Sequence, residues 1–159
     1  MPFRYKVLPE HRLLFGVFHG TLTPGEYLNG IEELSRNPAF EPDYDRLGIL
    51  HDDLDLSLFG LKELHAIRDR MSTAYYGNHR PEDTEKRSYR IAAVSKPSIN
   101  ETMLKLYAAT LASSLVSTVS MKMFPRLDKA LEWLERDELA ARFAEPDWVA
   151  FMAFDARSG

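Results

Sequence analysis

The chain has 159 residues, and 45% of them are hydrophobic, which is enough to bury one core without disulfide bonds. A formal net charge of −4 makes nucleic acid and anionic membrane surfaces poor electrostatic partners. The absence of cysteine excludes thiolate chemistry, and no apolar run approaches the roughly 18 residues of a membrane span, so we expect a cytoplasmic protein.

The chain is expected to begin with a β-hairpin. Residues 3–7 alternate apolar and basic side chains, which indicates a strand with one buried face. Residues 12–19 are apolar on both faces and therefore predict a more central strand, which pairs with the first.

A helix is predicted over residues 23–35. Thr23 offers a hydroxyl cap, Pro24 fits the first helical position, and Glu26 completes a capping box. The following loop, residues 37–43, holds two prolines, which disfavour helix at the residues before them.

The next strand, loop and helix form the centre of the predicted fold. Residues 47–50 are a short apolar run, residues 51–55 are an acidic turn, and a helix follows that ends near Gly77. The apolar positions that form the pattern of this helix are Leu61, Leu64, Ile67 and Met71. In open α/β sheets ligands bind beyond the carboxyl ends of the strands, so the acidic turn is the first place to look for function.

The second half of the chain continues the alternation of strands and helices. Residues 78–88 are polar and predict an exposed loop, and residues 89–95 predict a buried strand. Residues 98–101 form a second capping box, residues 119–123 alternate as an edge strand does, and residues 127–136 predict a last full helix. The stripe expected on the helix that starts near residue 98 is Met103, Leu106, Tyr107, Thr110, Leu111 and Ser114.

These elements predict a single α/β domain over residues 1–136, with a mixed sheet of about five strands and about four helices. Residues 137–159 form a C-terminal extension. Trp148, Phe151 and Phe154 make this extension too apolar for a loose end, so it packs either on the same chain or against a dimer partner.

Two stretches, together with the order of the elements, resemble the STAS-like proteins of bacteria, a group that includes SpoIIAA-like proteins and anti-sigma-factor antagonists. They are NPAFEPDY at residues 37–44 and FPRLDKALEWL at residues 124–134. The resemblance implies a non-catalytic regulatory module that binds a protein partner or itself.

In phosphorylatable STAS domains a serine at the start of the second helix takes the phosphate. If Gly60 matches the glycine of that motif, Leu58 and Phe59 occupy the seryl positions and Ser57 falls one place earlier. Ser57 is therefore either a weak phosphosite candidate or a plain helix N-cap.

The acidic turn contains the densest group of titratable side chains: His51, Asp52, Asp53 and Asp55. They could bind a small ligand or a divalent cation, or act as an acid and a base in a minor enzyme. Alternatively, they only stabilise a helix N-terminus, by about 0.3 to 1 kcal/mol each. No metal-ligand spacing or catalytic motif is present, so we assign no catalytic residue, metal or cofactor.

Three tyrosines, Tyr75, Tyr76 and Tyr107, are candidates for lining an apolar pocket between helices, although their spacing is more typical of ordinary core packing. Three methionines, Met103, Met121 and Met123, are interpreted as core side chains.

Overall fold

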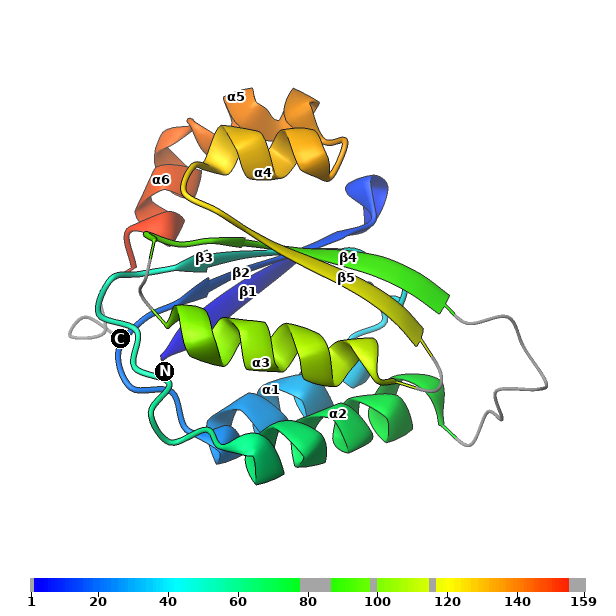
Figure 1. Cartoon of the computed structure of the whole chain (residues 1–159). Coiled ribbons are helices and arrows are strands. Elements are labelled where there is room, and N and C mark those ends of the chain that lie inside the picture. Colours follow the sequence, from blue (N-terminus) through cyan, green and yellow to red (C-terminus); the bar gives the residue numbers. More distant parts are fainter. Residues whose placement is uncertain (1, 78–86, 98–99, 115–116, 155–159) are drawn as a thin grey trace.

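The computed structural model describes residues 2–77, 87–97, 100–114 and 117–154, and it shows a five-stranded mixed sheet in the order β1-β2-β3-β4-β5 (Figure 1). The strands are β1 (Phe3–Leu8), β2 (Leu13–Phe18), β3 (Asp45–Leu50), β4 (Arg87–Val94) and β5 (Ser117–Phe124). β1 is antiparallel to β2, and all other neighbours are parallel. The predicted hairpin followed by alternating strands and helices is confirmed.

Helices cover both faces of the sheet. The three crossover helices lie on one face, because right-handed connections between strands taken in consecutive order return on the same side (Figure 1). They are α1 (Pro24–Ser35), α2 (Leu61–Tyr76) and α3 (Glu101–Ala112). The C-terminal helices α4 (Leu127–Trp133), α5 (Ala140–Phe143) and α6 (Pro146–Met152) cover the other face.

The described residues contain six α-helices rather than the predicted four or so. The difference arises in the C-terminal extension, which folds into short segments. Glu135 has a positive φ of 61°, which ends the preceding helix, and a 3-10 turn at Asp137–Leu139 leads into α5. Pro146 then starts α6, at a position where its missing N–H is not needed.

Helix α1 begins as the sequence predicts. The Thr23 hydroxyl accepts a hydrogen bond from the Glu26 N–H at 3.1 Å, and the Glu26 carboxylate accepts one from the Thr23 N–H at 3.1 Å. Ile31 and Leu34 are buried, as the pattern requires.

Two details of the other crossover helices differ from expectation. The N-cap of α2 is Gly60, whose N–H donates to Glu63, so the interpretation of Ser57 as the N-cap is wrong. In α3 the buried face contains Leu104, whereas Leu106 is 40% exposed, because two residues along a helix turn a side chain to the opposite side. The serine of the expected second capping box, Ser98, and most of the expected loop at residues 78–88 lie outside the described residues.

The C-terminal extension packs on the sheet of its own chain. The ring of Phe15, fully buried in β2, lies 4.8 Å from that of Phe143, 5.7 Å from Trp148 and 5.3 Å from Phe151, measured between centroids. Phe154 is also buried, against the ring of His19 at 4.3 Å. This is the first of the two arrangements that the sequence leaves open, and a dimer contact through these residues stays a prediction.

A buried ion-pair network joins the extension to the sheet. The Asp45 carboxylate at the start of β3 accepts hydrogen bonds from the Arg136 guanidinium at 2.7 Å and from the Arg90 guanidinium at 3.2 Å. Arg136 also donates to the main-chain carbonyls of His11 and Arg12. One carboxylate therefore ties together β3, β4 and the segment that follows α4.

Candidate functional site

The acidic turn lies at the carboxyl end of β3, but its side chains do not converge. The His51 ring forms a hydrogen bond with the main-chain carbonyl of Met152 in α6, so it holds the C-terminal extension in place. Asp52 forms an exposed ion pair with Lys96 at 2.7 Å, and Asp53 is exposed to solvent. Across the described ranges, no group of three or more histidine, aspartate or glutamate side chains could hold a metal ion.

Asp55 and Ser57 form a local turn at the same end of the sheet. The Asp55 carboxylate accepts a hydrogen bond from the Ser57 N–H at 2.8 Å. Hydrogen bonds from Ser57 lower the pKa of Asp55 from its ordinary value. The Ser57 side chain is exposed, and its phosphorylation stays a prediction.

A largely apolar hollow lies elsewhere, between the sheet and helices α1, α2 and α3. It is a cavity of about 180 Å³. Residues of the sheet line one side of the cavity, and residues of the three helices line the other. The turn after β3 contributes Leu54 and Leu56. Nearly all of the lining side chains are apolar, so the cavity suits an apolar molecule.

A row of small residues in the sheet explains why this space is not filled. Gly16 in β2 pairs with Gly48 in β3, and Gly48 pairs with Ala93 in β4. All three line the cavity, because alternate residues of a strand face the same side. Large residues next to this row, such as Phe18 and Leu50, face the helices as well. The side chains of the row itself are too short to reach helices α1, α2 and α3.

Among the described residues that line the cavity, one carries a charge: Arg46 at the start of β3. Arg46 is only 9% exposed. Its Nη1 donates to the main-chain carbonyls of Pro42 and Tyr44, and its guanidinium carbon lies 3.6 Å from the ring centroid of Tyr89. Its Nη2 is buried without a hydrogen-bond partner. The neighbouring carboxylate, Asp45, is already paired with Arg90 and Arg136.

The other polar groups of the lining are tyrosine hydroxyls. Those of Tyr27 and Tyr107 lie 2.7 Å apart and share a hydrogen bond. Burial raises the pKa of Tyr27, Tyr75 and Tyr107 above the ordinary value of 10.0, so all three are neutral at physiological pH. Within the described lining, arginine and tyrosine are the only side chains with ionisable groups.

Sequence reasoning identified part of this lining. It weighed three tyrosines as pocket residues, and the structure places Tyr75 and Tyr107 in the cavity but not Tyr76. It missed Arg46 and Gly48. The available signal was the period of two along β3, which puts an arginine and a glycine on the same face of an otherwise apolar strand.

Among the described helices, none combines the length and the apolar character needed to cross a membrane. Comparison of the chain with models of known protein families, with curated proteins and with solved structures found no match. The resemblance to STAS-like proteins therefore stays a prediction, and the function has to be argued from the cavity.

Proposed function

We propose that this protein binds a small, mainly apolar molecule in the cavity between the sheet and helices α1, α2 and α3. The observation that carries the proposal is an apolar space of about 180 Å³ inside the fold, with a few polar groups directed into it. An apolar cavity of about 150 Å³ stays dry and binds benzene in another protein. The size therefore fits a single ring or a short chain.

The energetics support a retained binding site rather than a packing defect. Empty volume in an enclosed cavity costs about 24 cal/mol per Å³, so about 4 kcal/mol is the upper limit of the cost of leaving 180 Å³ unfilled. A larger side chain in the sheet could fill this volume. A Cβ added at Gly48 would meet its nearest neighbours at 3.6 to 4.0 Å, which is ordinary van der Waals contact. A bound molecule would recover the contacts that the bare cavity lacks.

Methionine methyl groups provide a direct assay. Met71, Met103 and Met121 line the cavity, whereas Met123 and Met152 do not. Titration of a 13C-methyl-methionine sample with 2-phenylethanol, a neutral probe of suitable size, should shift the first three signals in a saturable way. The signal of Met152 serves as the internal control, because Met123 lines a separate pocket.

A matched pair of variants connects the binding to the cavity. Gly48→Val places a branched side chain on the sheet side of the cavity, and valine suits a strand. Gly25→Val makes the same change in α1, where a Cβ meets nothing within 4 Å. Binding should fall about 4- to 15-fold in the first variant and persist in the second, since losing one or two buried methyl groups of ligand contact has that effect. Absence of saturable binding to the wild type, or unchanged binding by a folded Gly48→Val protein, would contradict the proposal.

A protein-binding regulatory role, as the sequence resemblance implies, is the second candidate. Leu58 and Leu61 support it, since both are more than half exposed next to the loop that contains Ser57. Pull-down from host extract with the wild type and with a Leu58→Ser, Leu61→Ser double variant tests this role. Loss of a specific partner in the double variant is the expected result, and the same capture by both proteins would contradict it.

A further inference from the structure

The charge of Arg46 sets it apart from the rest of the cavity lining. An arginine side chain stays protonated at any physiological pH, so its burial places a full positive charge inside the protein. Buried charges are ordinarily paired, because an isolated charge in a medium of low polarity carries a large desolvation cost. Two carbonyl oxygens and the rings of Tyr89, Phe40 and Tyr75 stabilise the guanidinium partly, but none of these groups carries a negative charge.

The protein offers Arg46 no anion in the described part of the chain. Asp45 precedes it in β3 and therefore points to the opposite face of the sheet, where it pairs with Arg90 and Arg136. The nearby tyrosine hydroxyls stay neutral, because burial raises the pKa of Tyr75 and Tyr89. One donor of Arg46, Nη2, is left buried without an acceptor.

We infer that the molecule bound in the cavity is a carboxylic acid whose anionic group pairs with Arg46 while its ring or chain lies over Gly48. This inference rests on the proposed function and names the class of ligand. A carboxylate fits better than a phosphate group, because one unpaired guanidinium balances one negative charge and only one of its nitrogens, Nη2, lacks an acceptor.

The order of residues along β3 gives the ligand its orientation. Arg46, Gly48 and Leu50 are successive residues on the face that lines the cavity, and alternate residues of a strand lie about 6.7 Å apart. The carboxylate therefore lies near the start of β3, and the apolar body crosses the small-residue row at Gly48 and extends along β3 toward Leu54 and Leu56 in the turn after the strand. A single-ring arylacetic acid or a fatty acid of six to eight carbons matches this arrangement.

Two probes of nearly the same shape separate the charge from the apolar contact. Phenylacetate carries the carboxylate, and 2-phenylethanol is neutral. Isothermal titration should show that the wild type binds phenylacetate about 10- to 100-fold more tightly, which is the range expected for a hydrogen bond to a charged group. Preference of the wild type for the alcohol would overturn the inference without any variant, and the inference stays testable even if a variant fails to fold.

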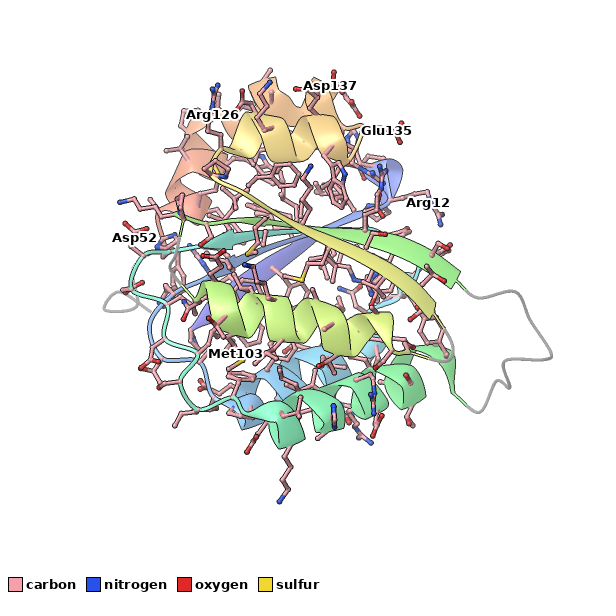
Figure 2. All side chains as sticks on the ribbon, viewed as in Figure 1. Arg12, Asp52, Met103, Arg126, Glu135 and Asp137 are labelled. Carbon is pink, nitrogen blue, oxygen red and sulfur yellow. The ribbon has the colours of Figure 1, made fainter. Side chains whose placement is uncertain are left out.

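The variant Arg46→Met removes the guanidinium and keeps an unbranched apolar chain. Its control, Arg126→Met, removes the same charge beside α4, on the other side of the sheet from Met103 (Figure 2). Phenylacetate affinity should fall about 10- to 100-fold in Arg46→Met alone, with 2-phenylethanol affinity unchanged within about threefold.

The outcomes distinguish the two levels of the proposal. Equal loss of both probes in Arg46→Met, or no loss of phenylacetate, overturns the assignment of a carboxylic acid and leaves the cavity as an apolar binding site. If neither probe binds the wild type and no methionine signal of the cavity shifts, the proposed function itself is wrong, and the inference falls with it.

Discussion

The substitution Gly48→Ala should make the protein more stable. The added methyl group would contact Phe18 and Leu50 at 3.6 to 4.0 Å, without a clash. Burying one methyl group contributes about 0.8 kcal/mol. Replacing glycine by alanine at a position with an ordinary backbone conformation adds about 0.4 to 1 kcal/mol, because it restricts the unfolded chain. The expected gain is the sum of these contributions, about 1 to 2 kcal/mol.

Thermal unfolding of a chain of this length measures such a gain well. A change of 1 kcal/mol shifts the midpoint by about 2 to 4 °C, so Gly48→Ala should melt about 2 to 8 °C higher than the wild type. Gly16→Ala is the control, because its Cβ would lie 3.2 Å from the Phe18 ring and part of the gain would be lost to a shift of that ring. A lower melting temperature for Gly48→Ala would show that the space above β3 is already filled, and it would refute the reasoning from the cavity.

Three further predictions concern the scaffold. Asp45→Asn should lower the free energy of unfolding in urea by about 3 kcal/mol, because it leaves the largely buried guanidinium of Arg136 without its anion and Arg90 with only the exposed carboxylate of Glu135, and a loss below about 1 kcal/mol would argue against the network. Gly30→Ala should lower the melting temperature, since its Cβ would lie 2.5 Å from the Phe3 ring. Gly25→Ala is the control, because its Cβ has open space and the melting temperature should not fall. A melting temperature lower in Gly25→Ala than in Gly30→Ala would contradict this prediction. Burial raises the pKa of Tyr107 above 10.0, so above about pH 10 the folded state keeps a proton that the unfolded state loses. The free energy of unfolding in urea should therefore stay constant below about pH 10 and decline above it. No decline by about pH 11 would contradict the burial of this hydroxyl.

The sequence was sufficient to predict the fold because each element has a local signal. The alternation at residues 3–7 is visible in the sequence, and the capping box of Thr23 and Glu26 sets the start of α1. The orientation of α3 was harder, since its apolar residues occupy more than one side of the helix. Contact with the sheet selects Leu104 and leaves Leu106 exposed, and that selection depends on tertiary packing rather than on the helix alone.

The cavity was not predictable in the same way, because it depends on residues far apart in the chain. Gly16, Gly48 and Ala93 become neighbours only through the register of three strands. A single small residue in a strand does not indicate a cavity, and this cavity exists only because all three small residues lie in one row. The acidic turn drew attention for the opposite reason: its residues are adjacent in sequence, but the structure directs His51 and Asp52 to different partners.

The two faces of the sheet are packed differently, and this difference supports separate roles. Beneath α4, α5 and α6 the strands present Leu13, Phe15 and Leu47, which are essentially without solvent exposure and pack into one core cluster with these helices. Beneath α1, α2 and α3 the same strands present the small-residue row, and Gly48 in the central strand keeps some exposure. Substitutions on the first face should therefore change stability alone. Substitutions on the second should change ligand affinity and stability in opposite directions when they fill the cavity, because the same volume cannot hold both a side chain and a ligand.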